Sequence, residues 1–350
     1  MRNKFKAVVT TVLALSVFLG FTGFKADGNL LAVATLANNH SERISLSPGG
    51  VAFGVKYFTK GALVVGITDI ETAQGLQCPA RDAGLSVKDI ITSINGKEIK
   101  NAEDFQKTVN ACEGKSIEVK YIRDGVENSL KITPVVDKNE NVYKLGLWVR
   151  DSTAGIGTIT FVDRKSGRFG GLGHGICDSE TGTLLPLDRG IIVNVKITEI
   201  VTGKKNAPGE LKGVFDRFRR GELTNNSEVG VFGILDEIPS GIGEEIPIGF
   251  KNELQTGKAY IITTLDAGRP EEFEIEIEKI YPDSGPTKNF MIKITDSDLI
   301  ARTGGIIQGM SGSPIIQNGK LVGAVTHVLV GDSTRGYGIH IENMLAGMQK

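Results

Sequence analysis

The chain is poor in the residues that build disulfide scaffolds, metal clusters and nucleic-acid-binding surfaces. Its 350 residues include only 3 cysteines, 4 histidines and 1 tryptophan. An odd cysteine count leaves at least one thiol without a partner in the chain, which excludes a scaffold held together by disulfides. The sequence has no second cysteine and histidine pair with zinc spacing, so we predict no metal and no cofactor. The net charge of -1 at pH 7 gives no reason to expect a nucleic-acid partner.

Glycine is abundant instead, with 45 residues, whereas aromatic residues make up only 6% of the chain. This composition favours short strands joined by tight turns over long helices. From about Tyr143 onward, segments of alternating polar and apolar residues recur between turns, which predicts a β-barrel or sandwich. In Glu271–Glu278 the alternation places apolar side chains in a core and glutamates in water, so a metal or glycosidase site is not needed to explain it. We predict a mainly β protein with two or three domains.

The amino terminus carries an export signal or a membrane anchor. Three basic residues within residues 1–6 precede an uncharged stretch, Ala7–Phe24. A positive start followed by such a stretch is typical of both kinds of segment. No strong small-residue cleavage site follows it, which favours an anchor that is not removed. We predict this segment over residues 1–26, a linker over 27–44, and the rest of the chain outside the cytoplasm.

Residues 45–136 predict a glycine-rich loop, several strands and two helices. A short helix ends at Ala83-Gly84-Leu85, and Asp89–Lys97 reads as a strand with an Asn-Gly turn. A second helix follows Asn101, a good N-cap residue. The pattern resembles a PDZ domain. That resemblance implies that the loop holds the terminal carboxylate of a peptide, which adds a strand to the sheet edge. The predicted peptide-binding residues are Gly50, Phe53, Gly54 and Val55; the alternative is that these glycines only make a tight turn.

The strongest functional signal is the sequence Gly-Met-Ser-Gly-Ser-Pro at Gly309–Pro314. Small residues on both sides of Ser311 allow a tight turn that holds its hydroxyl outward. The amides of Gly309 and Ser311 would then point at one spot, which is the arrangement of a nucleophile with its oxyanion hole. Ser313 lies between glycine and proline and is expected to shape the turn.

A serine nucleophile needs a base, and His174 is the best candidate. It lies in the glycine-rich segment Phe169–Gly175, where the backbone can turn sharply and the imidazole has room to meet a substrate. The order of histidine first and serine last is that of chymotrypsin-like enzymes. His327 is expected on a strand that lines the pocket, which makes it a weaker candidate for the base. His340 is weaker still, and His40 is too near the membrane segment. Cys177 as a nucleophile or metal ligand is a remote alternative.

Together these motifs resemble the stage IV sporulation protein B peptidases of endospore-forming bacteria. The resemblance rests on the export segment, the PDZ-like region, and the motifs at Gly171–Ile176, Gly304–Pro314 and Gly336–Glu342. It implies a peptidase domain over residues 140–350 and an oriented triad of His174, Asp296 and Ser311. Asp298 is the nearest alternative to Asp296 as the acid, and Asp178 and Asp266 also stay open.

The same resemblance implies a biological role. The protein would be a serine endopeptidase, exported across the forespore membrane into the intermembrane space, that cleaves itself and then a regulatory membrane protein. It would thereby signal between forespore and mother cell during sporulation, with the PDZ domain controlling its action. Two alternatives belong to other classes: a catalytically silent PDZ scaffold, and a general extracytoplasmic quality-control protease. The position of the PDZ-like region before the peptidase argues against the second.

Overall fold

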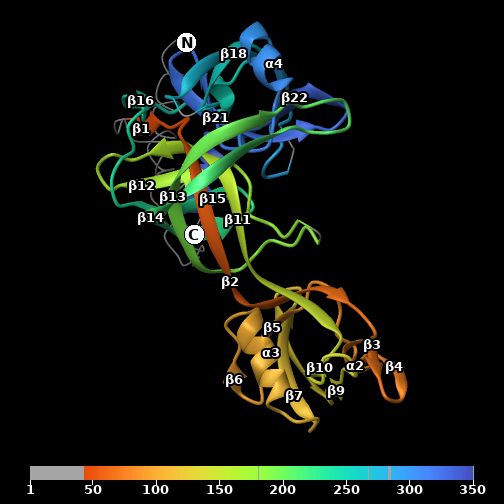
Figure 1. The fold of residues 1–350 in the computed structure, drawn as a ribbon. Helices are drawn as coiled ribbons and strands as arrows, with labels where there is room; N and C mark the ends of the chain where they lie inside the picture. The colour runs from red at the N-terminus through yellow and green to blue at the C-terminus, as the bar shows by residue number, and fades with distance from the viewer. Residues whose placement is uncertain (1–42, 180, 267, 283–284, 350) are drawn as a thin grey trace, which may run out of the picture. The chain divides into compact units, whose positions relative to one another are not determined.

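The computed structural model describes residues 43–179, 181–266, 268–282 and 285–349 (Figure 1). Residues Ile44–Lys350 form one compact unit. The predicted export segment, residues 27–42 of the predicted linker and His40 lie outside the described residues. Within the described part of the chain, no helix combines the length and apolarity needed to cross a membrane.

Two closed barrels of antiparallel strands make up most of the unit. In the first, hydrogen-bonded pairs run from β2 through β13, β14, β15, β12 and β11 and back to β2. Its strands are β2 (Ala52–Ile67), β11 (Leu147–Val162), β12 (Arg168–Gly171), β13 (Leu187–Val201), β14 (Glu210–Ser227) and β15 (Gly230–Leu235). Strands β1 (Ser45–Pro48) and β16 (Ile246–Pro247) extend the sheet beside β11.

The second barrel follows the first in sequence, in the order β17-β18-β19-β22-β21-β20. Its strands are β17 (Gly257–Thr263), β18 (Glu271–Ile280), β19 (Phe290–Ile294), β20 (Pro314–Gln317), β21 (Lys320–Leu329) and β22 (Asp332–His340). Three further elements accompany it: η1 (Lys251–Glu253), α4 (Ser297–Thr303) and α5 (Ile341–Met348). The predicted alternation in β18 is confirmed, because Phe273, Ile275 and Ile277 are buried while Glu274 pairs with Lys258 at 2.6 Å on the outer face.

Apolar side chains fill both barrels, and two of the buried clusters contain residues from both. In the first, the rings of Phe53 and Phe169 meet edge to face at 5.9 Å, and the fully buried Tyr57 donates its hydroxyl to Leu185 O at 2.6 Å. In the second, Ile292 and Ile315 are completely buried. Burial of this kind is the main stabilising contribution to a β-barrel. The structure thus confirms the prediction of a mainly β fold with barrels.

A smaller module is inserted into the first barrel, between β2 and β11. It contains β3 (Ile70–Thr72), β4 (Gly75–Gln77), α2 (Pro79–Ala83), β5 (Ile90–Ile94), β6 (Lys97–Glu98), α3 (Ala102–Asn110), β7 (Ile117–Arg123), β8 (Val126–Ile132), β9 (Val135–Val136) and β10 (Tyr143–Lys144). The predicted caps are confirmed: Asn101 accepts a bond from the Asp104 amide at 2.7 Å, and Gly84 closes α2 with a φ of 90°. We call residues 68–146 the inserted module.

The expected carboxylate-binding loop is not part of this module. Phe53, Gly54 and Val55 lie in β2, hydrogen-bonded between β11 and β13, and Phe53 is only 2% exposed. Gly50 is enclosed as well, since its carbonyl accepts the Thr264 hydroxyl at 2.8 Å. The structure corrects this expectation, because buried and paired backbone cannot offer its amides to a peptide carboxylate.

Strands β2 and β11 join the module to the first barrel as one long antiparallel ribbon (Figure 1). Residues 52–59 of β2 pair within the barrel, whereas Ala62 and Leu63 pair with β5 of the module. The first barrel therefore begins at the segment predicted to open the PDZ-like region.

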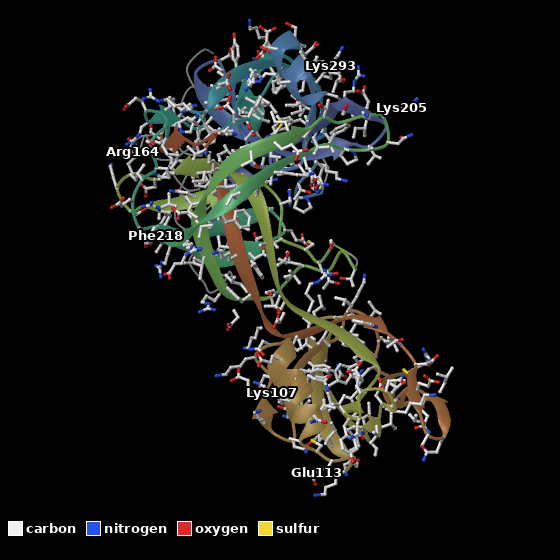
Figure 2. All side chains as sticks on the ribbon, in the orientation of Figure 1. Lys107, Glu113, Arg164, Lys205, Phe218 and Lys293 are labelled. Atoms are coloured by element: carbon white, nitrogen blue, oxygen red, sulfur yellow. The ribbon has the colours of Figure 1, made fainter. Side chains whose placement is uncertain are left out.

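The basic run Arg217–Arg220 lies in β14. Arg219 pairs with Asp236 and Glu222, both at 3.2 Å, and Arg220 approaches Asp216 at 3.8 Å. Phe218, between Arg217 and Arg219, is 70% exposed, with its side chain on the outside of the ribbon (Figure 2). Neighbouring carboxylates balance these guanidinium groups, so the run does not form an isolated basic patch.

Candidate active site

The turn around Ser311 is anchored to the first barrel by two threonines of β11. Thr158 donates its amide to Ser311 O at 3.0 Å and its hydroxyl to Gly309 O at 2.8 Å. Thr160 donates its hydroxyl to Gly312 O at 2.7 Å. Both threonines are fully buried. These bonds turn three carbonyls of the turn toward β11 and so fix its orientation between the barrels.

The shape of the turn depends on glycine. Gly312 has a φ of 94°, and a Cβ there would lie 2.1 Å from Thr158 O and 2.4 Å from Leu172 N. No side chain fits in that space. Ser313 is fully buried and donates both its amide and its hydroxyl to Met310 O, at 2.9 and 2.7 Å. This confirms that Ser313 shapes the turn.

Two amides of the turn are left for a ligand. Met310 and Gly312 donate theirs to Ile307 O at 3.1 Å and Val325 O at 2.8 Å. The amides of Gly309 and Ser311, by contrast, have no acceptor among the residues that the structure describes. Paired free donors beside a serine hydroxyl are the arrangement that stabilises a developing oxyanion.

His174 lies in the same cavity as Ser311. The cavity has a volume of about 480 Å³ and is lined by both residues. His174 follows β12 after a sharp turn in which Leu172 and Gly173 have φ values of 65° and 68°. Such a φ is unusual for leucine and marks a strained backbone next to the histidine. His174 Nδ1 lies 2.9 Å from Gly175 O, so a proton on Nδ1 would leave Nε2 free to accept one. Burial lowers the pKa of this imidazole.

His327 faces His174 from β21, with the ring centroids 5.1 Å apart. It lines the cavity, as the sequence predicted for this strand. Its Nδ1 is buried without a hydrogen-bond partner among the described residues. Burial, and then the neighbouring His174 and Lys288, lower the pKa of His327 to about 4. The two rings are therefore neutral together near pH 7.

The hydroxyl of Ser311 donates to Thr326 O at 2.9 Å in this structure. The structure thus brings Ser311, His174 and Gly309 to one cavity, with the Ser311 hydroxyl bonded to a neighbouring carbonyl and not to His174.

No carboxylate joins them. The described residues that line the cavity include neither aspartate nor glutamate. Asp296 is the N-cap of α4 instead, where one oxygen accepts the amides of Asp298 at 2.9 Å and Leu299 at 3.0 Å. This corrects the expectation that Asp296 orients His174, because its carboxylate is held at the helix end.

The alternative acids are also engaged elsewhere. Asp298 and Asp266 both approach Arg302, at 3.2 and 3.5 Å. Asp178 is completely buried and pairs with Arg150 at 2.6 Å. In this structure, therefore, none of these three carboxylates is bonded to Nδ1 of His174, which lies 2.9 Å from Gly175 O instead.

Substitutions at Asp296 separate its capping role from a catalytic one. We expect Asp296→Ala to lower the free energy of unfolding by about 1 kcal/mol, and Asp296→Ser to keep most of it because serine is also a good N-cap. Urea denaturation of both variants measures this. A stable Asp296→Ser variant that has lost serine reactivity would return the carboxylate to the catalytic set.

The buried histidines make stability depend on pH. Burial is the first cause that lowers the pKa of both His327 and His340 from 6.5 to about 4. Between pH 6.5 and 4 the unfolded chain binds protons that the folded chain does not, so stability falls as the pH is lowered through that range. The loss is ~3 kcal/mol at most for each histidine. Denaturation midpoints across this range measure it. In the double variant His327→Gln/His340→Gln the fall should shrink; an unchanged profile would contradict the assignment.

Comparison with known proteins agrees with this geometry. Residues 141–345 match the SpoIVB peptidase S55 family, and residues 59–133 match the PDZ domain family. The chain belongs to the SpoIVB peptidase S55 family. It is thus a peptidase with a PDZ domain, and the PDZ match covers residues 68–133 of the inserted module but not its last two strands, β9 and β10. The residues predicted as the PDZ loop lie outside that match.

The individual proteins that resemble this chain match it over a short stretch or at low sequence identity. A probable protease, Eep, of Enterococcus faecalis is 34% identical over 106 residues, which cover 29% of this chain. The chain spans about a quarter of that relative's length, 24%. Among solved structures, the active form of the Rv3671c protease of M. tuberculosis is 13% identical, with a TM-score of 0.31, covering 70% of this chain and 84% of that one. The PDZ domain of an SdrC-like protein from Listeria monocytogenes is 19% identical, with a TM-score of 0.21, covering 26% and 87%.

The sequence did not single out Thr158 and Thr160. Their signal is weak but present: two threonines alternate with apolar residues in the last part of β11, residues 156–162, and both are fully buried. The cysteines contribute no bridge, since Cys78, Cys112 and Cys177 are all free. Across the described ranges, no group of histidine, cysteine and acidic side chains is arranged to hold a metal ion.

Proposed function

We propose that this S55 peptidase is a serine endopeptidase with Ser311 as its nucleophile and His174 as its base. One observation carries the proposal: Ser311, His174 and Gly309 line a single cavity, and the amides of Gly309 and Ser311 have no acceptor among the described residues. His174 Nε2 would take the Ser311 proton as Oγ attacks the peptide carbonyl. The amides would stabilise the oxyanion, and the protonated imidazole would then donate its proton to the leaving amine. Water, activated by the same histidine, would release the acyl group.

The test uses the full chain in detergent and an alkyl fluorophosphonate, which reacts with activated serines. Stoichiometric labelling at Ser311, located by mass spectrometry, supports the proposal. Absence of labelling under conditions where a known serine peptidase reacts completely would reject it.

A catalytically silent scaffold remains the second candidate, favoured by two observations. The Ser311 hydroxyl is bonded to Thr326 O, and none of the described residues brings a carboxylate to His174. A scaffold would bind peptides without labelling at Ser311, so the same experiment separates the two functions.

We propose that the PDZ ligand adds a strand beside Leu147–Arg150 of β11. This segment pairs with β2 on one edge, and no other described strand pairs with it. Just before it, the carbonyls of Leu145 and Gly146 accept bonds from Ala80 and Thr68. No described group accepts a bond from the amides of these two residues. Free amides beside an open strand edge suit a peptide that ends in a carboxylate.

Strand β11 also connects the PDZ domain to the residues proposed for catalysis. Consecutive residues of β11 bind two different elements: Arg150 pairs with the buried Asp178 at 2.6 Å, and Asp151 accepts the amide of Ala102 at the start of α3, at 2.8 Å. Asp178 lies four residues after His174, and Thr158 farther along β11 holds the Ser311 turn. We infer that ligand binding at β11 regulates the peptidase through these bonds.

Arg150→Ala should reveal this coupling. We expect it to slow fluorophosphonate labelling of Ser311 several-fold, because the loop that follows His174 loses a buried ionic partner. Arg123→Ala is the matched control: Arg123 pairs with the buried Asp89 at 2.7 Å within the inserted module. It should lower stability comparably and leave the labelling rate unchanged. Equal labelling in both variants would contradict the coupling.

The remaining parts of the function are proposals that rest on the motif resemblance. They comprise export across the forespore membrane into the intermembrane space, retention through the amino-terminal segment, self-cleavage, and cleavage of a regulatory membrane protein that signals between forespore and mother cell. Self-cleavage is the simplest to test: the full chain should shorten on incubation, and an equal mixture of wild type and Ser311→Ala shows whether one molecule cleaves another.

A further inference from the structure

The cavity at Ser311 is lined by uncharged side chains, of which about half are aliphatic and the rest are polar groups such as Thr153, Gln308 and Thr326. The described lining residues include no aspartate, glutamate, lysine or arginine. The volume, about 480 Å³, falls in the range of about 300 to 1,000 Å³ that is usual for ligand sites. The aliphatic residues with large side chains that line it are Val55, Ile156, Leu172, Ile176, Ile306, Ile307 and Val328.

Part of this wall is fixed by the core of the second barrel. Ile306 and Ile307 are 3% and 2% exposed and belong to the same buried cluster as Met310. Ile156 and Val328 are partly exposed and pack against that cluster. A wall anchored in this way cannot easily move aside to let water reach a charged group.

The wall lies where the substrate side chain must go. Ile306 and Ile307 lie three and two residues before Gly309, whose amide is one of the proposed oxyanion donors. Val328 lies two residues after Thr326, the residue that contacts the Ser311 hydroxyl. A peptide carbonyl held by the amides of Gly309 and Ser311 carries its side chain on the adjacent Cα. That side chain would enter the cavity that Ile307 and Val328 line.

Gly155 is a lining residue without a side chain. It lines the cavity from β11, and a Cβ placed there would find no atom within 4 Å. Its φ is not in the left-handed region, so a side chain is compatible with the strand. A larger residue at this position would occupy cavity space without a clash in the core.

We propose that this cavity selects substrates with an uncharged aliphatic side chain on the residue whose carbonyl is attacked. The inference rests on the proposed serine mechanism and adds the substrate class. A lysine or glutamate side chain would lose its hydration there without gaining an ionic partner, whereas valine or leucine would exchange water for aliphatic contacts.

The test uses four aryl phosphonate esters of single amino acids, with valine, leucine, lysine or glutamate side chains. In the reaction Ser311 Oγ bonds to phosphorus, an aryloxide leaves, and the serine proton passes to His174. Labelling of the full chain is followed by mass spectrometry. We expect the valine and leucine reagents to react at least tenfold faster than the other two. A lysine or glutamate reagent that reacts as fast as leucine overturns the inference.

Two variants strengthen this test. Val328→Glu places a carboxylate in the wall and should raise the relative rate of the lysine reagent at least tenfold. Val330→Glu is the matched control, because Val330 is 60% exposed and does not line the cavity. Gly155→Val should slow the leucine reagent more than the valine reagent. Unchanged selectivity in both cavity variants would overturn the assignment.

The experiments distinguish a failure of the serine mechanism from a failure of the aliphatic selectivity. If neither the phosphonates nor the fluorophosphonate label Ser311, the serine mechanism is rejected and the specificity falls with it. If the fluorophosphonate labels Ser311 but the charged phosphonates are preferred, the mechanism stands and the aliphatic selectivity is rejected.

Discussion

Ser311→Ala is expected to abolish fluorophosphonate labelling and self-processing. The turn holds its hydroxyl beside two amides that no described group occupies, and removal of a nucleophile from such a site lowers kcat by about 10⁴ to 10⁶. The fold should be unaffected, since the Ser311 side chain makes one hydrogen bond, to Thr326 O. Labelling yield and the accumulation of a shortened chain measure the effect.

Ser313→Ala is the control for this prediction. Its hydroxyl donates to Met310 O inside the turn and is fully buried. Loss of that bond should lower the free energy of unfolding by about 1 kcal/mol while labelling continues. Labelling that survives in Ser311→Ala and disappears in Ser313→Ala would reverse the assignment of the two serines.

His174→Ala is expected to be as inactive as Ser311→Ala. His174 shares the cavity with Ser311 and is neutral near pH 7 because burial lowers its pKa, so it can accept the serine proton. The double variant His174→Ala/Ser311→Ala should be no worse than either single variant, since the two groups act as a unit. Labelling rates for the three variants, measured on chains with unchanged far-UV circular dichroism, test this.

His327→Ala is expected to keep the reactivity that His174→Ala loses. It faces His174 at 5.1 Å and lines the cavity, so its loss should change which phosphonates react while measurable labelling remains. An inactive His327→Ala together with an active His174→Ala would show that the base was assigned to the wrong histidine.

The local signals in the sequence were sufficient for several features. Alternation in β18, the caps of α2 and α3 and the role of Ser313 all depend on residues close together in the chain, and the structure confirms each. The barrels themselves follow from many short alternating segments between glycines. Local structure of this kind can be predicted from a sequence because each residue's partner lies within a few positions.

The pairing of strands that lie far apart in the chain could not be predicted from the sequence. Phe53–Val55 read as a loop that runs into a strand, yet all three residues lie in β2 and pair with residues 155–157 of β11 and 192–194 of β13. Asp296 stands a short distance before Ser311 in the sequence, but its carboxylate caps α4. The position of Asp296 in the sequence does not reveal whether its carboxylate caps the neighbouring helix or binds an imidazole far away in the chain.

By itself the sequence determined that the chain is mainly β, and it identified the serine turn and the glycine-rich histidine segment that the structure brings together. Those motifs are short, and their residue types are dictated by backbone angles that few other residues adopt. Only the tertiary structure decided how the module is inserted in the first barrel, that Thr158 and Thr160 orient the serine turn, and that uncharged side chains, about half of them aliphatic, line the cavity. These features depend on contacts between segments far apart in the chain, whose pairing is set by the packing of whole barrels.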